Sequence, residues 1–257
     1  YTARNPRRGS KMSTPFLGDP QPLLFYKGLY HFYFLRNDDY PTGNGTAWYH
    51  QTSPDGKTWT DAGIAIPKYT TGNGDAWSGS FYIDTNNRIG RGADVLYAFL
   101  TMPYTDGQGV ARWYSTDGYT FTYDQQVLTN SEPTGVNDRV FRDPHVFWSD
   151  DDNCFYLIQA EIGEVSIYTS SSTTSWTKVS SVSMPGYGTV ERPMLFKMSA
   201  WTMGIDRVGG PQITDTTSWV LFVSGNNSSK YPTTAVYYWT GSFSKGVYTP
   251  DDFSSPQ

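Results

Sequence analysis

The stretch Leu29-Tyr-His-Phe-Tyr-Phe34, followed by Ala47-Trp-Tyr-His50 and by Ser53-Pro-Asp-Gly-Lys-Thr-Trp59, decides the fold class. It holds two short aromatic runs of the kind that form β-strands, and then a turn sequence rich in Ser, Pro, Asp and Gly. The same order of strand, strand and turn recurs along the chain. With Phe32 as the marker of the first copy, the equivalent positions Tyr97, Tyr156 and Leu221 follow at steps of 65, 59 and 65 residues.

A repeat of this length with several strands is typical of a β-propeller blade, although blades are more often roughly 40–50 residues long. No amphipathic helix pattern of useful length stands out between the repeats. We therefore predict an all-β propeller with four blades in this chain. The ring either closes with four blades or continues beyond residue 257, and an irregular sandwich with coincidental spacing is the alternative.

The composition is compatible with a sugar-binding protein and equally with a chain whose aromatic residues simply form strands. The net charge of −5 gives no reason to expect nucleic acid or an anionic membrane as a partner. Aromatic residues reach 17%, with 20 Tyr and 9 Trp, and aromatic faces suit the apolar C–H faces of sugar rings, although they also form strands well. No apolar run approaches the roughly 20 residues of a membrane span. The chain begins at Tyr1 rather than Met, as a processed chain does, and we expect a secreted protein.

Four polar motifs interrupt the repeats, and each precedes the hydrophobic strand of a blade. Asp19 lies 13 residues before Phe32, and Asp143 lies 13 residues before Tyr156. The innermost strand of every propeller blade lines the central channel, so motifs that open successive blades are expected to converge there. The motifs are Gly18-Asp-Pro20, Trp77-Ser-Gly-Ser80, Arg142-Asp-Pro144 and Glu191-Arg-Pro193.

Three carboxylates in these motifs indicate glycoside hydrolysis. Two neighbouring carboxylates are the minimum for that reaction, one as nucleophile or base and one as acid, and a third can hold sugar hydroxyls. A single Asp before Pro usually marks a turn. Three such motifs in phase with the repeat favour a site made of Asp19, Asp143 and Glu191.

The series of motifs resembles glycoside hydrolase family 32, the invertase, inulinase and levanase group, and its relative family 68, the levansucrases. Gly18-Asp-Pro-Gln-Pro22 stands where family 32 has Asn-Asp-Pro-Asn-Gly, and Trp77-Ser-Gly-Ser80 and Arg142-Asp-Pro144 match its motifs. Glu191-Arg-Pro193 is closer to the levansucrase motif. The resemblance runs from about residue 16 to about residue 253.

The resemblance implies a five-bladed propeller and assigns roles to the residues of the motifs. Asp19 would be the nucleophile, Glu191 the acid/base and Asp143 the transition-state stabiliser. The fructosyl unit would be bound by Trp77, Ser78, Arg142 and Arg192, and also by Trp48 in Trp48-Tyr-His-Gln51, which resembles the family's Trp-Gly-His segment or is simply packed inside a blade.

No metal or other cofactor is expected, because this chemistry needs none. The three histidines, His31, His50 and His145, show no metal-ligand spacing, and we interpret them as structural or pocket-edge residues.

Two departures from the family pattern bear on the substrate. Gly18 replaces an Asn, and Leu35 stands where invertases often carry a Gln. Both weaken an assignment as a sucrose invertase and favour fructan-processing relatives. The resemblance also implies a fifth blade and a C-terminal β-sandwich, neither of which is visible, so we interpret residues 1–257 as an incomplete catalytic propeller domain.

The sequence thus predicts a retaining glycoside hydrolase or fructosyltransferase that acts on β-fructosyl linkages of levan, inulin or sucrose through a covalent fructosyl-enzyme. Retention requires the carboxyl groups of Asp19 and Glu191 to lie about 5–5.5 Å apart. Two alternatives stay open at this point. One is an inverting arabinanase or xylosidase on the same type of propeller, and the other is a catalytically inactive sugar-binding propeller.

Overall fold

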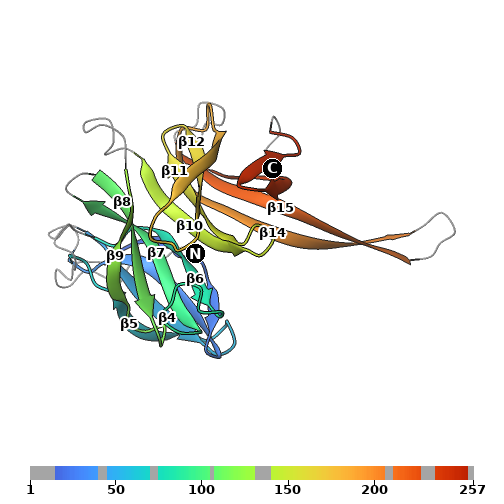
Figure 1. The fold of residues 1–257 in the computed structure, drawn as a ribbon. Helices are drawn as coiled ribbons and strands as arrows, with labels where there is room; N and C mark the ends of the chain where they lie inside the picture. Colours follow the sequence, from blue (N-terminus) through green and yellow to red (C-terminus); the bar gives the residue numbers. More distant parts are fainter. Residues whose placement is uncertain are drawn as a thin grey trace, which may run out of the picture.

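A computed structural model describes residues 15–39, 45–69, 75–104, 107–130, 140–205, 211–226 and 235–253 of the chain. It confirms the predicted fold class, because the described residues form four antiparallel sheets and no helix (Figure 1). Among these residues there is accordingly no helix that is long and apolar enough to cross a membrane.

Each sheet is one blade, built from strands that follow one another in the sequence. Blade 1 holds β1 (Phe16–Pro20), β2 (Leu24–Tyr26), β3 (Leu29–Asn37), β4 (Ala47–Ser53) and β5 (Thr60–Ile66). Blade 2 holds β6 (Gly79–Asp84), β7 (Val95–Tyr104), β8 (Gly107–Ser115) and β9 (Thr122–Thr129). Blade 3 holds β10 (Phe141–Ser149), β11 (Cys154–Glu161), β12 (Glu164–Ser170) and β13 (Thr177–Ser183). Blade 4 holds β14 (Thr189–Ile205), β15 (Pro211–Asn226), β16 (Ala235–Ser244) and β17 (Val247–Pro250).

The first strands of neighbouring blades meet at the centre of the molecule. Strand β10 of blade 3 contacts β6 of blade 2 on one side and β14 of blade 4 on the other. The long strands β14 and β15 pair along their whole length and extend as an arm away from the blades (Figure 1). The first strands are therefore the ones that can bring residues from several blades to one place.

The recurring turn of the sequence has a shared hydrogen-bond pattern. The Ser53 hydroxyl oxygen accepts the backbone N–H of Asp55 and Gly56, and the Asp55 carboxylate accepts the N–H of Lys57 and Thr58. Ser115 and Asp117 make the equivalent contacts in blade 2. Ser and Asp side chains mimic backbone acceptors in such turns, and in both blades the motif joins the last two strands, β4 to β5 and β8 to β9.

Hydrophobic cores lie between adjacent blades. Side chains alternate along each middle strand, so that one strand contributes residues to the cores on both of its faces. In β7, Leu96 and Leu100 pack toward blade 1, whereas Tyr97 and Phe99 pack toward blade 3. A third cluster, which includes Tyr156, Leu221 and Trp239, joins blades 3 and 4. Successive residues of a strand point to opposite faces, so one buried strand can serve two interfaces.

No hydrophobic core among the described residues joins blade 4 to blade 1. The outer face of blade 4 carries a ladder of stacked rings, with Phe196 on Phe222 at 5.4 Å and Phe222 on Tyr238 at 5.4 Å. On blade 1, Ile64 is 51% exposed. Phe196 and Phe222 are half-buried and Tyr238 is 37% exposed, so the four blades described leave these apolar faces partly open.

Two stacked imidazoles, His31 and His50, lie buried between blades 1 and 2 and belong to none of the four polar motifs. His31 Nδ1 lies 2.9 Å from His50 Nε2, and His31 Nε2 lies 3.2 Å from the Tyr26 carbonyl oxygen. A carbonyl can only accept, so His31 carries its proton on Nε2 and its Nδ1 accepts from His50. Both rings are neutral in this arrangement, and Nδ1 of the buried His50 has no hydrogen-bond partner.

This pair predicts a loss of stability in acid. Burial lowers the pKa of His50 to about 3 and also lowers that of His31. In the unfolded chain the pKa of each imidazole is about 6.5. Above that pH both states are neutral, whereas below it the unfolded chain binds protons that the folded chain does not. The urea midpoint should therefore be lower at pH 5 than at pH 7.5.

The matched variant is His50→Phe, which keeps a ring to stack on Tyr33 but does not titrate. We expect it to lose part of the pH dependence of the urea midpoint. A residual part should remain, because burial also lowers the pKa of His145 to about 4. An unchanged pH dependence in His50→Phe would contradict this account.

Candidate active site

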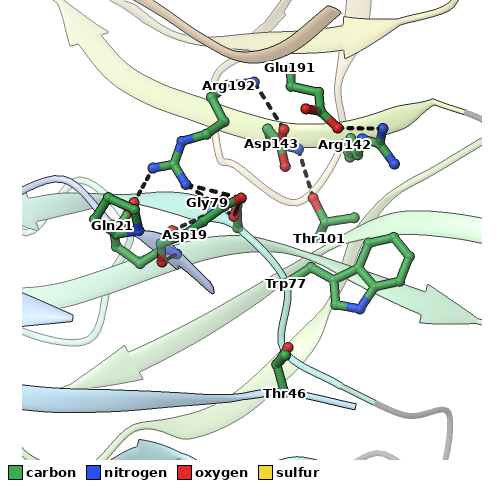
Figure 2. Close-up of polar contacts among 12 residues, drawn as sticks. Asp19, Gln21, Thr46, Trp77, Gly79, Thr101, Arg142, Asp143, Glu191 and Arg192 are labelled. Atoms are coloured by element: carbon green, nitrogen blue, oxygen red, sulfur yellow. Dashed lines mark hydrogen bonds and ion pairs between the residues drawn. The ribbon is translucent and has the colours of Figure 1, made fainter. Parts of the chain in front are cut away.

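One open cavity of about 190 Å³ gathers most of the predicted site residues. Its wall comes from all four blades, and most of the side chains that line it are labelled in Figure 2. The cavity is lined by Asp19, Leu35, Thr46, Trp77, Ser78, Arg142, Asp143 and Glu191. The structure thus brings together all three predicted carboxylates, together with Trp77, Ser78 and Arg142.

The three carboxylate motifs lie at irregularities of the first strands. In each case two residues face a single residue of the neighbouring strand, between Leu17 and Pro20, between Arg142 and His145, and between Glu191 and Met194. A bulge of this kind re-aims side chains, and proline is tolerated there because no ladder N–H is needed. Asp19 and Asp143 lie within their bulges, whereas Glu191 is the last paired residue before the third bulge.

Asp19 is held by donors from two other blades. The Ser78 hydroxyl donates to Asp19 Oδ2 at 2.8 Å, and Nη1 of Arg192 lies 3.3 Å from the same oxygen. Arg192 also donates to the carbonyl oxygen of Pro20 and, at 3.2 Å, to the Ser78 hydroxyl (Figure 2). Because these partners fix one oxygen, the Asp19 carboxylate has a defined orientation while its side chain stays 53% exposed.

Glu191 forms an ion pair with Arg142 across blades 3 and 4. The distance from Arg142 Nη2 to Glu191 Oε1 is 2.7 Å (Figure 2). The Glu191 side chain is 32% exposed, so the carboxyl group remains accessible from the cavity. The ion pair therefore orients the Glu191 side chain and leaves it partly exposed.

Asp143 is the buried member of the carboxylate group. Its Oδ2 accepts the backbone N–H of Arg192 at 2.9 Å, and its own N–H donates to the Thr101 hydroxyl at 2.7 Å. Burial raises the pKa of Asp143 to about 6, although the Arg192 N–H and the charges of Arg142 and Arg192 oppose that rise. Burial therefore makes the Asp143 carboxylate easier to protonate than that of an exposed aspartate.

Trp48 is placed differently from the substrate-binding role predicted for it. Its side chain is fully buried, it does not line the cavity, and its indole N–H donates to the Trp77 carbonyl oxygen at 2.8 Å. The packing alternative holds for Trp48, since strand alternation turns it into the core between blades 1 and 2. Through this hydrogen bond, Trp48 holds the backbone of Trp77.

Arg192 lies beside the cavity rather than in its wall. It borders a second, smaller space of about 10 Å³ near the centre, which has room for about one water molecule. His145 also borders that space, and its Nδ1 accepts the Leu195 N–H at 3.2 Å. His145 therefore has a contact that fits a structural role.

Sequence reasoning did not single out several residues that hold the site. The buried Gln21 donates to the Asp19 carbonyl oxygen at 3.1 Å and accepts the Gly79 N–H at 2.9 Å, so it ties the first motif to the second. Its position inside Gly18-Asp-Pro-Gln-Pro22 was the available signal. Thr101 and Thr46 carried none, because each lies in an ordinary strand or loop sequence.

A sequence profile described as the glycosyl hydrolases family 32 N-terminal domain matches residues 11–256. The chain belongs to glycoside hydrolase family 32. Among its relatives, the levanbiose-producing levanase of Bacillus subtilis (strain 168) is 37% identical over 91% of this chain and 43% of its own length. The extracellular exo-inulinase of Aspergillus niger is 31% identical over 96% of this chain and 50% of its own length.

Solved family 32 structures show the same propeller. The fructofuranosidase of Schwanniomyces occidentalis, complexed with fructose, is 29% identical with a TM-score of 0.73 over 92% of this chain and 46% of that one. The exo-inulinase of Aspergillus awamori is 26% identical with a TM-score of 0.74 over 94% of this chain and 50% of that one. The chain thus spans about half the length of the relatives that it matches.

The described residues offer no obvious metal centre. No group of three or more His, Cys, Asp or Glu side chains within them is arranged to hold a metal ion. The cationic groups of the site are instead Arg142 and Arg192, each paired with a carboxylate.

Proposed function

We propose that this family 32 chain cleaves β-fructosyl linkages of fructans with retention of configuration, through a fructosyl unit bound covalently to Asp19. The observation that carries the proposal is the cavity shared by Asp19, Asp143 and Glu191, with an arginine beside each of the two carboxylates assigned to bond making and proton transfer. Two carboxylates facing one cavity supply both the nucleophile and the acid that a retaining glycosidase needs.

In the first step an oxygen of Asp19 attacks C2 of the fructosyl unit. The bond from C2 to the leaving oxygen breaks, and that oxygen takes the proton of Glu191. In the second step the Glu191 carboxylate takes a proton from water, whose oxygen attacks C2 and releases Asp19 as a carboxylate. A sugar hydroxyl in place of that water would give transfer instead of hydrolysis.

Asp143 and Trp77 serve binding in this proposal. A carboxylate has about four acceptor sites, so Asp143 can receive sugar hydroxyls besides the Arg192 N–H. The half-buried Trp77 offers an aromatic surface in the cavity wall to the apolar face of the sugar. The experiment that tests the function is incubation with levan, inulin and sucrose, followed by chromatography of the released sugars. No release from any of the three would overturn the proposal.

Leu35 favours fructans over sucrose within this proposal. It lines the cavity, and a Cβ at position 18 would lie 3.2 Å from the Leu35 Cβ, so Gly18 leaves space for this side chain. In levan and inulin the leaving oxygen is attached to a methylene group, whereas in sucrose it is attached to a ring carbon of glucose surrounded by hydroxyls. An apolar wall offers those hydroxyls no partner.

We therefore expect Leu35→Gln to raise kcat/KM on sucrose relative to levan by roughly two- to tenfold, the value of about one added hydrogen bond. Leu35→Met is the matched control, because it keeps an apolar side chain of similar volume. Initial rates on both substrates measure the ratio. A ratio that moves equally in Leu35→Met and Leu35→Gln would contradict the role given to Leu35.

We also propose that a fifth blade beyond residue 257 completes the ring and that the protein is secreted. The partly exposed aromatic ladder on blade 4, with Met198 45% and Val236 62% exposed on the same sheet, supports the first statement, since exposed apolar patches often mark an interface. The extracellular exo-inulinase among the relatives supports the second.

A further inference from the structure

Trp77 is held at three points by residues outside its own motif. Its backbone N–H donates to the Thr101 carbonyl oxygen at 2.9 Å, and its carbonyl oxygen accepts the Trp48 indole N–H at 2.8 Å. Its own indole N–H donates to Asp75 Oδ2 at 2.8 Å. The first two contacts fix the backbone, and among these three only the bond to Asp75 fixes the ring.

The ring needs such a contact because Trp77 is not a core residue. It is half-buried in the cavity wall, whereas Trp48 behind it is fully enclosed by packing. A side chain at an open wall can rotate unless a directional bond selects one orientation. A bond from an indole N–H to a carboxylate is charge-assisted and therefore among the stronger ones available.

Asp75 is itself placed by the loop around Gly45. Gly45 has φ of +89°, and a Cβ there would lie 3.1 Å from the Asp75 carboxyl carbon, so the backbone packs directly against the carboxylate. Beside it, the Thr46 hydroxyl donates to the Ala76 carbonyl oxygen at 2.7 Å, and the Ala76 N–H donates to the Thr46 carbonyl oxygen at 3.2 Å. The backbone around Gly45 and Thr46 therefore holds the Asp75 carboxylate in place.

We propose that Asp75 is a positioning residue, which orients the Trp77 indole so that its face covers the bound fructosyl unit. Asp75 acts through Trp77 and need not touch the sugar. This inference rests on the proposed function, because it supposes a sugar in the cavity. It assigns to the reaction a carboxylate that lies outside the four sequence motifs.

The test is a double-mutant cycle between position 75 and position 77, measured on levan with the intact protein. Asp75→Ala should raise KM about tenfold with a smaller change in kcat, because the charge-assisted hydrogen bond that orients the ring is lost. Asp75→Asn keeps an oxygen that can accept the indole N–H and should recover most of the affinity. In the Trp77→Phe background, which has no N–H to hold, Asp75→Ala should have no further effect.

Equal losses in Asp75→Asn and Asp75→Ala would overturn the inference, as would a full Asp75→Ala effect in the Trp77→Phe background. Thermal melting of each variant shows whether the propeller has folded. A failure of the proposed function is distinguishable, because the unmodified protein would then release no sugar from levan in any arm of the cycle.

Discussion

Asp19→Asn should lower kcat on levan by a factor on the order of 10⁴ or more, the size of loss seen when a covalent nucleophile is removed. The amide has nearly the same shape as the carboxylate, and its oxygen can still accept the hydrogen bond that the Ser78 hydroxyl gives at 2.8 Å. It cannot form the ester to C2, so the first step fails although the cavity is preserved. Initial rates of sugar release from levan measure the loss.

The matched control for that experiment is Asp61→Asn, the same substitution in the same blade. Asp61 lies exposed on β5, where its carboxylate accepts a hydrogen bond from Gln51 at 2.8 Å, away from the cavity. Its activity should match that of the unmodified protein. Substantial turnover by a folded Asp19→Asn variant would show that another group makes the bond to C2.

Glu191→Ala should show a loss that depends on the leaving group. On levan, where the leaving alkoxide needs a proton, we expect kcat to fall on the order of 10³-fold. On β-fructofuranosyl fluoride, whose leaving group needs no proton, the first step should be far less affected. Added azide should then restore turnover and give fructosyl azide, because azide attacks C2 without needing a base.

Glu191→Gln separates proton transfer from a purely structural role. Its amide oxygen can still accept the hydrogen bond from Arg142, which the carboxylate receives at 2.7 Å, but it cannot supply the proton. Kinetics on both substrates should therefore resemble those of Glu191→Ala. If Glu191→Gln keeps most of its activity on levan, the role of Glu191 is to hold Arg142, and the assignment as acid/base is wrong.

The sequence predicts well those features that depend on local patterns of residues. The spacing of Phe32, Tyr97, Tyr156 and Leu221 reports four middle strands, because strand alternation and turn residues are local signals. The convergence of the motifs follows from the fold, since each motif occupies the first strand of its blade or, for Trp77 and Ser78, directly precedes it.

The remaining features depend on contacts between blades, which no local pattern contains. The Trp of a Trp-Tyr-His-Gln strand fits a pocket residue and a core residue equally well, and only the packing against blade 2 shows that Trp48 is core. The hydrogen bonds of Arg192 to blades 1 and 2, and of Asp75 to Trp77, join residues whose sequence gives no sign of a partner. The predicted strand 218–223 also covers only part of β15, which runs over Pro211–Asn226.

The central claim is retention through a fructosyl unit on Asp19, and methanol trapping tests it most directly. Methanol competes with water for the fructosyl-enzyme and gives a methyl fructofuranoside whose configuration at C2 does not change in solution. Proton and carbon NMR of the product formed from levan should show methyl β-fructofuranoside, because two successive inversions restore the β configuration. Methyl α-fructofuranoside as the first product would contradict the account and would instead support an inverting enzyme.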